Sequence, residues 1–165
     1  MKKNLEGMVI FVIGVSGTGK TLVSQLLARD LSVPFFDADD HHPKSNINKM
    51  TQGIPLNDKD RQPWLDELNR IAIENIESGC VMACSALKQD YRDRLSASIE
   101  KKIVWIYLSG TYDQVYDRMI NREGHFMKEK MLMSQFETLE EPPDAVKIDI
   151  SKSPTEIIHL IKSNI

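Results

Sequence analysis

The chain has 165 residues and a formal net charge of -3, a length that suits one domain, residues 1–165, built around a sizeable core. The acidic balance argues against a nucleic-acid-binding protein, which normally carries a basic face. No run approaches the roughly 20 apolar residues that span a bilayer, so we expect neither nucleic acid nor a membrane as partner.

The apolar segment 9–13 predicts a buried strand, and residues 14–21 directly after it read GVSGTGKT. They match G-x-x-x-x-G-K-[ST], the phosphate-binding P-loop. Apolar residues after the loop recur at helical spacing, so the motif lies between a strand and a helix. The alternative is a glycine turn without function, which the agreement of motif and context disfavours.

The glycines of this loop let main-chain N–H groups point inward at a triphosphate where the helix begins. Lys20 would place a positive charge on the β and γ phosphates, and the hydroxyl of Thr21 can ligate Mg2+. We therefore expect ATP and Mg2+ as cofactors. The residues expected to hold the nucleotide are Gly14, Ser16, Gly17, Thr18, Gly19, Lys20 and Thr21.

Acidic residues follow a short second strand that is predicted at residues 33–36. Asp37 and Asp39 would face the same way if the extended geometry continues through them. We expect Asp37 to ligate Mg2+ and Asp39 to accept the proton of an acceptor hydroxyl; the alternative is a pair of solvated turn acids. His42 is a candidate hydrogen-bond partner of a substrate hydroxyl, or else a surface residue. Pro43 suits the first position of a new helix.

The middle of the chain predicts an amphipathic helix marked by apolar residues at 64–76, a third strand at 80–84 and a helix at 88–99. Cys80 and Cys84, four residues apart in a strand, are too far from each other to form a disulfide. We expect both to be buried, reduced thiols, which fits a cytoplasmic protein.

Two cations follow the third strand. Lys88 and Arg92 lie four residues apart, and neither has an acid at the same spacing to neutralise it. A monoanionic acceptor would suit this pair. Arg61 is another candidate for the carboxylate of such an acceptor, although the aspartates beside it could satisfy it instead.

The second half of the chain continues the alternation of strands and helices. A fourth strand is predicted at 103–108, helices at 112–122 and 128–136, a fifth strand at 145–150 and a final helix at 154–163. Such alternation predicts an α/β fold with a parallel sheet and right-handed crossovers. Ligands of these sheets bind at the carboxyl ends of the strands, where the segments described above should converge.

Arg118 and Arg122 are like charges four residues apart on one predicted helix, a spacing that is unfavourable unless an anion lies between them. Bound ATP would supply that anion. Arg118 could stack on the adenine, and Arg122, close to Gly124, could cover the transferring phosphoryl group as an internal arginine finger. The alternative is a solvated basic face.

Several of these segments together resemble the small P-loop gluconate kinases along nearly the whole chain. The marks are GVSGTGKT at 14–21, FDADD at 36–40 followed by His42-Pro43, the run 46–65, CSALK at 84–88 with Tyr91-Arg92-Asp93, and REGHFM at 122–127 with Ser134-Gln135. The P-loop by itself would name only the superfamily.

The resemblance implies a three-layer P-loop fold with a five-stranded parallel sheet in the order 2-3-1-4-5, helices on both faces and a small lid at about residues 122–137. It implies phosphorylation of D-gluconate at its terminal hydroxyl to 6-phospho-D-gluconate by a homodimer. It also implies that Asp39 lies beside the acceptor hydroxyl. The residues implied for the acceptor pocket are Arg61, Lys88 and Arg92.

Two other functions remain as alternatives. A related small-molecule kinase, acting on shikimate or another sugar acid, would use the same loop and a similar monoanionic acceptor. A nucleotide-dependent binding module of the GTPase type would need D-x-x-G and N-K-x-D motifs, and neither occurs in the chain.

Overall fold

The computed structural model describes residues 7–121 and 125–165, and its centre is one parallel sheet. The strands are β1 (Val9–Ile13), β2 (Phe35–Asp37), β3 (Cys80–Ala83), β4 (Ile103–Ser109) and β5 (Val146–Asp149). Their order is β2-β3-β1-β4-β5, and every neighbouring pair is parallel. The predicted fold class and strand order are both confirmed.

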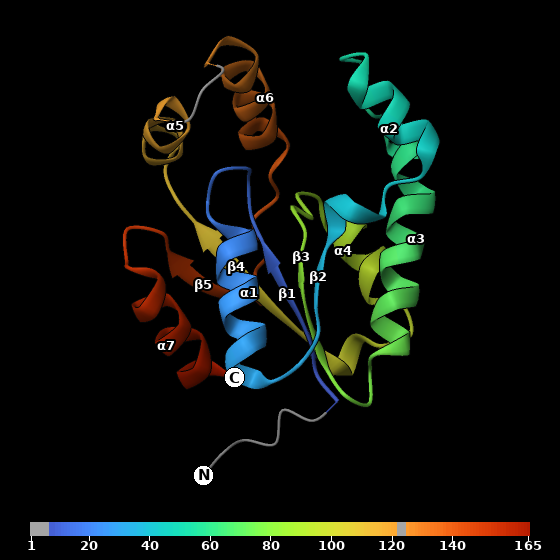
Figure 1. The fold of residues 1–165 in the computed structure, drawn as a ribbon, viewed down its shortest axis with the longest axis vertical. Helices are drawn as coiled ribbons and strands as arrows, with labels where there is room; N and C mark the ends of the chain where they lie inside the picture. Colours follow the sequence, from blue (N-terminus) through green and yellow to red (C-terminus); the bar gives the residue numbers. More distant parts are fainter. Residues whose placement is uncertain (1–6, 122–124) are drawn as a thin grey trace.

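Helices connect the strands and cover both faces of the sheet (Figure 1). The α-helices are α1 (Lys20–Leu31), α2 (Lys44–Thr51), α3 (Asp58–Glu74), α4 (Gln89–Ser96), α5 (Tyr112–Ile120), α6 (His125–Thr138) and α7 (Pro154–Asn164). Two short 3-10 helices, η1 (Ala38–His41) and η2 (Glu100–Lys102), complete the order.

Strand β1 is fully buried and supplies side chains to two separate cores, because successive residues of a strand point to opposite faces. Val9, Phe11 and Ile13 pack with apolar residues of α3 and α4. Ile10 and Val12 pack with residues of α1 and α7 on the other face. Each buried aliphatic or aromatic side chain contributes about 1.5–3 kcal/mol, so the central strand is firmly held.

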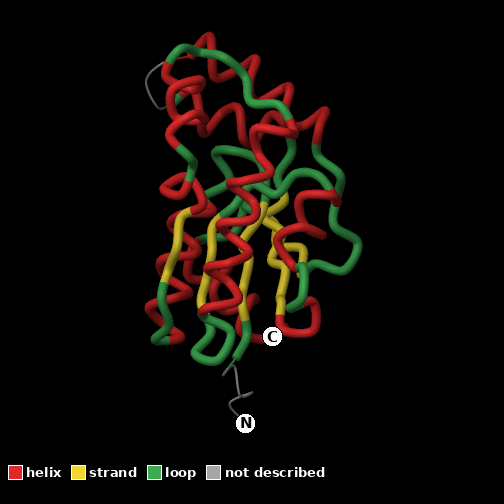
Figure 2. Tube along the Cα trace, turned by 90° about the vertical axis from the view of Figure 1, so that its right-hand side faces the viewer, coloured by secondary structure: helices red, strands yellow, loops and turns green. Residues whose placement is uncertain are grey.

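The carboxyl ends of the strands form one edge of the sheet, and the segments with unusual chemistry lie there. Figure 1 places α2 and α6 beyond this edge, on opposite sides of it, and Figure 2 shows helices and loops extending well past the strands. The described start of the chain and its carboxyl terminus lie at the other end. The sheet thus presents its carboxyl edge between two helical projections.

Several element boundaries differ from the sequence-based prediction. The second strand begins at Phe35 instead of residue 33, and α3 begins at Asp58, well before its first apolar residue. The early start has a local cause: Asn57 and Asp60 form a capping box at the start of α3. Pro43 lies at the N-cap of α2, one position before the predicted one.

Cys80 and Cys84 are buried, free thiols, as predicted. Burial raises the pKa of each thiol to about 12. Within the described residues, no helix is both long and apolar enough to cross a lipid bilayer.

Candidate active site

The P-loop joins β1 to α1, and its conformation requires glycine. Gly14 has a φ of 146°, and a Cβ atom there would lie 2.8 Å from the carbonyl oxygen of Leu108. Gly19, at the N-cap of α1, has a φ of 90° in the left-handed region. The hydroxyl of Thr18 donates to the carbonyl of Val15 at 2.9 Å and closes the turn. These constraints curl the main chain around the start of α1.

Lys20 is the first residue of α1, and its side chain folds back over the loop. Its Nζ donates to the carbonyl oxygen of Val15 at 2.9 Å. Burial lowers the pKa of Lys20 to about 8, and the nearby carboxylates of Asp39 and Asp37 partly oppose this effect. The ammonium group therefore lies within electrostatic reach of both predicted acids.

Asp37 connects the P-loop helix to the turn that follows β2. Its Oδ2 accepts a hydrogen bond from the Thr21 hydroxyl at 2.9 Å, and its Oδ1 accepts one from the main-chain N–H of Asp39 at 3.0 Å. The extended geometry does not continue to Asp39, because Asp37 caps the 3-10 helix η1 and the strand ends there, so the condition for the two acids to face the same way is not met.

The oxygens of Thr21 and Asp37 fit the predicted Mg2+ site. Mg2+ prefers oxygen ligands and is commonly held by one or two side chains together with substrate phosphates and water. The described residues contain no cluster of three or more histidine, cysteine or acidic side chains that could hold a metal ion. The hydroxyl–carboxylate pair is the donor set that a phosphate-bound Mg2+ would require.

Asp39 lies on η1, and its environment makes its carboxylate a better base than usual. Burial is the largest cause of the raised pKa of Asp39, and the neighbouring Asp37 adds to it. His42 and Lys20 oppose the rise. An aspartate with a raised pKa accepts a proton more readily, which suits the predicted general base.

His42 lies between Asp39 and the start of α2. Its ring stacks on Trp64 at 4.2 Å between centroids, and its Nδ1 is 3.3 Å from the side-chain nitrogen of Asn46. That nitrogen also donates to the carbonyl of Asp60, so the amide orientation makes Nδ1 an acceptor and leaves the proton on Nε2. Burial lowers the pKa of His42, which favours this neutral form.

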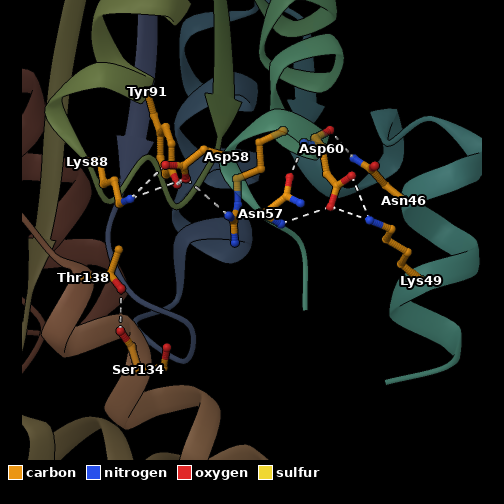
Figure 3. A network of polar contacts seen from close by, with 10 residues as sticks. Asn46, Lys49, Asn57, Asp58, Asp60, Lys88, Tyr91, Ser134 and Thr138 are labelled. Carbon is orange, nitrogen blue, oxygen red and sulfur yellow. Dashed lines mark hydrogen bonds and ion pairs between the residues drawn. The ribbon is translucent and has the colours of Figure 1, made fainter. Parts of the chain in front are cut away.

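Arg61 and Lys88, two predicted acceptor ligands, both pair with Asp58. Figure 3 shows Lys88 and Tyr91 directed at Asp58. Lys88 Nζ lies 3.2 Å from Asp58 Oδ2, and an Arg61 guanidinium nitrogen lies 3.7 Å from Oδ1. The hydroxyl of Tyr91 also donates to Asp58, and both cations lie over its ring. We call these four residues the acceptor cluster. It carries one net positive charge, which leaves capacity for one more carboxylate.

The hydrogen bond from Tyr91 is the main reason for the lowered pKa of Asp58, followed by the one from Lys88. Asp58 therefore stays ionised, and the bond to it raises the pKa of Lys88. Lys88 has no acid at helical spacing, as the sequence shows, but it is paired all the same, because Asp58 comes from α3 and not from the helix that follows Lys88.

Arg92 lies in the interior, with 2% of its surface exposed. Its two terminal nitrogens donate to the carbonyls of Ala86 and Glu140, each at 2.7 Å, and one of them also donates to the side chain of Gln89 at 3.2 Å. Burial lowers the pKa of Arg92. The guanidinium thus joins the loop after β3 to the segment after α6, and its contact with an acceptor stays a prediction.

Arg92→Ala is expected to lower the free energy of unfolding by about 2–4 kcal/mol, because it removes three hydrogen bonds and leaves buried carbonyls unpaired. Urea unfolding measures this loss. Arg94→Ala is the matched control on the same helix, since its exposed pair with Asp66 should contribute about 1 kcal/mol or less. An unchanged free energy of unfolding together with a raised KM for the sugar acid would instead make Arg92 an acceptor ligand.

Arg118 lies on α5 beside the P-loop. One guanidinium nitrogen donates to the carbonyl of Thr18 at 3.5 Å, and the other donates to the carbonyl of Ile150 after β5. Arg118, which the sequence predicts to stack on the adenine, therefore lies beside the P-loop. Arg122 lies outside the described residues.

The carboxyl edge of the sheet thus brings together Lys20, Thr21, Asp37 and Asp39, as the sequence predicts. Sequence reasoning allowed an aspartate beside Arg61 to pair with it, and Asp58 does so, but it missed that Asp58 also binds Lys88 and Tyr91 from the first turn of α3. Its signal was weak, because an aspartate at a helix start is explained by the helix dipole alone. Two contacts between Gln135 of α6 and Ser16 were also missed.

Fold and site define the class of the protein: a small P-loop kinase. The model of the shikimate kinase family matches residues 16–156. The mouse probable gluconokinase is 42% identical over 171 residues, covering 90% of this chain and 92% of the relative. The thermosensitive gluconokinase of Escherichia coli K12 is 44% identical over 154 residues, covering 89% of this chain and 81% of the relative.

A solved structure agrees with these relatives. The crystal structure of a gluconokinase from Sinorhizobium meliloti 1021 has a TM-score of 0.86 and 38% identity, and the match covers 95% of this chain and 90% of that one. The chain therefore belongs to the gluconokinase family.

Proposed function

We propose that the protein transfers the γ-phosphoryl group of ATP to the terminal hydroxyl of D-gluconate, giving 6-phospho-D-gluconate and ADP. Membership of the gluconokinase family supports this reaction. The observation that carries it is the hydrogen-bonded link from the Thr21 hydroxyl through the carboxylate of Asp37 to the main-chain N–H of Asp39, which holds the proposed base beside the P-loop helix.

In this reaction Asp39 accepts the proton of the terminal hydroxyl of gluconate while the oxygen of that hydroxyl bonds to the γ-phosphorus. The bond from that phosphorus to the β–γ bridging oxygen breaks, and ADP carries the electron pair away. Lys20 stabilises the negative charge on the phosphate oxygens, and the P-loop N–H groups hold them in place. Positioning and charge stabilisation supply most of the acceleration in phosphoryl transfer.

Thr21 and Asp37 are the residues that would hold Mg2+, which neutralises charge on the β and γ phosphates when bound. ATP would lie with its triphosphate along Gly14, Ser16, Gly17, Thr18 and Gly19. Arg118 would contact the adenine, a role that its bond to the Thr18 carbonyl supports by placing it beside the loop.

The acceptor carboxylate is proposed to bind Arg61 and Lys88. Their shared partner Asp58 supports this, because it keeps both cations extended beside Tyr91 while neutralising only one of their charges. The Nε2–H of His42 would donate to a gluconate hydroxyl near Asp39. Arg92 would belong to the same acceptor pocket, and its bond to the carbonyl of Ala86 would hold the loop after β3 in place there.

The proposal extends to the lid and the assembly, which rest on family membership, and to the compartment, which rests on the cysteines. Residues 122–137 would form the lid, with Arg122 covering the phosphoryl group as an arginine finger. The chain would act as a single domain and assemble as a homodimer, which light scattering would measure. Two buried free thiols, Cys80 and Cys84, support a reducing compartment such as the cytoplasm.

A substrate panel tests the proposed reaction. The wild-type protein is assayed for ADP formation with ATP, Mg2+ and, in turn, D-gluconate, other sugar acids, shikimate and nucleoside monophosphates. We expect D-gluconate to give the highest kcat/KM and no comparable ADP formation without an acceptor. Preference for shikimate would support the related-kinase alternative, and acceptor-independent hydrolysis would support a nucleotide-dependent module.

A further inference from the structure

Gln135 of α6 forms two hydrogen bonds with one residue of the P-loop, 119 positions away in the chain. The main-chain N–H of Ser16 donates to Gln135 Oε1 at 2.7 Å. The side-chain nitrogen of Gln135 donates to the hydroxyl oxygen of Ser16 at 3.0 Å. None of the residues assigned above to ATP, Mg2+ or gluconate explains why a glutamine should lie there.

The peptide group between Val15 and Ser16 connects Gln135 to the catalytic lysine. Its carbonyl oxygen accepts from Lys20 Nζ at 2.9 Å, and its N–H donates to Gln135. In a P-loop the lysine reaches the β and γ phosphates, so this peptide group lies at the terminal-phosphate end of the loop. Asp39, which acts on the acceptor, is also within electrostatic reach of Lys20.

A glutamine amide suits this position because it carries both an acceptor and a donor. A phosphate oxygen is a stronger acceptor than an amide oxygen, since hydrogen bonds to an ion are roughly twice as strong as neutral ones. The incoming phosphate would therefore take the N–H of Ser16. The NH2 group of Gln135 would then remain free to donate to the same phosphate.

Contacts of Glu140, just after α6, and of Leu132, within α6, fix the position of Gln135. Glu140 donates its N–H to the carbonyl of Leu87 at 2.8 Å, and its carbonyl accepts from Arg92 at 2.7 Å. Its side chain also accepts from the N–H of Gln89 at the start of α4, at 2.9 Å. Leu132, one turn before Gln135, is fully buried in the core beside α1. The buried Leu132 before Gln135 and the hydrogen bonds of Glu140 after it thus keep Gln135 beside the P-loop.

We propose that Gln135 binds the terminal phosphate of the nucleotide and makes α6 respond to whether a triphosphate or a diphosphate occupies the P-loop. This rests on the proposed function in one respect, that the P-loop binds ATP. A diphosphate lacks the group that competes for the N–H of Ser16, so the bonds from Gln135 to Ser16 persist with ADP and are exchanged with ATP.

The test is isothermal titration of the full chain with a non-hydrolysable ATP analogue and with ADP, each in Mg2+. Gln135→Glu keeps the shape of the side chain, removes its donor and adds a negative charge. We expect its affinity for the analogue to fall by about 10- to 100-fold, and its affinity for ADP by a much smaller factor. Asp144→Asn, an exposed position outside residues 122–137 with the opposite change of charge, should alter neither affinity.

Gln135→Ala is the second variant, and it should show the same selective loss with a smaller size because no charge is added. Equal weakening of both nucleotides, or none, in a variant that retains the wild-type melting temperature would overturn the assignment. The proposed function fails separately, if the wild-type protein does not bind the analogue or does not phosphorylate D-gluconate. If Gln135→Glu does not fold, Gln135→Ala decides the question.

Discussion

Lys20→Ala is expected to lower kcat/KM by at least about 100- to 1000-fold, the usual cost of removing one preorganised charge from a transition state. The Nζ group of Lys20 donates to the carbonyl of Val15, so the substitution removes a positive charge from the phosphate loop itself. A coupled assay of ADP formation with gluconate measures the loss. Lys101→Ala, at an exposed site on η2, is the matched control. A Lys20→Ala variant with near wild-type turnover would contradict the phosphate assignment.

The pH dependence of nucleotide binding gives an independent readout of the same lysine. Burial lowers the pKa of Lys20 to about 8, so the ligand-free protein loses this positive charge as the pH rises through that value. The triphosphate binds the protonated form, and its affinity should therefore fall above pH 8, by up to about tenfold per pH unit for one linked proton. Lys20→Arg should bind ATP without this dependence, because arginine stays protonated. The same slope in both proteins would assign the titration to another group.

Asp39→Asn is expected to lower kcat by about 100- to 10,000-fold, the usual contribution of a general base, and to change the KM for ATP far less. The amide keeps the size of the side chain but cannot take the proton of the acceptor hydroxyl. Steady-state kinetics with gluconate and ATP varied in turn separates the two effects. Asp40→Asn, the next residue of the same turn, is the control for the loss of one negative charge.

The acid limb of the pH profile belongs to the same prediction. Because burial and Asp37 raise the pKa of Asp39, the wild-type rate should decline on acidification at a higher pH than an ordinary aspartate would give. The deprotonated form is the active one, so activity is present above the raised pKa and is lost below it. Comparable changes in kcat and in the KM for ATP would assign Asp39 to nucleotide binding.

The fold could be predicted because each strand carries a strong local signal. Val9–Ile13 is an uninterrupted apolar run, and the sequence placed both of its ends correctly. The strand order needed the family resemblance, since alternation alone does not say which strands pair. Helix starts such as that of α3 were less accurate, because a capping box of polar residues determines them and the apolar pattern begins later.

The residues proposed to bind the nucleotide are contiguous in a motif, so the sequence alone can indicate them. The acceptor cluster joins Asp58 to Lys88 across 30 positions and to Tyr91 across 33, so its pairing arises from the packing of α3 against α4. The interior position of Arg92 likewise depends on Glu140, which is 48 positions away. Helical spacing shows which side chains share a face but not what packs against that face.

The two oxygens of Asp37 hold the Thr21 hydroxyl and the amide of Asp39 at the same time. One carboxylate therefore links the residue proposed to bind the Mg2+ of the nucleotide to the residue proposed to activate the acceptor. A shift of either residue is transmitted to the other through a single side chain. An isosteric Asp37→Asn change would offer an NH2 group in place of one of these oxygens, and would disturb both halves of the reaction together.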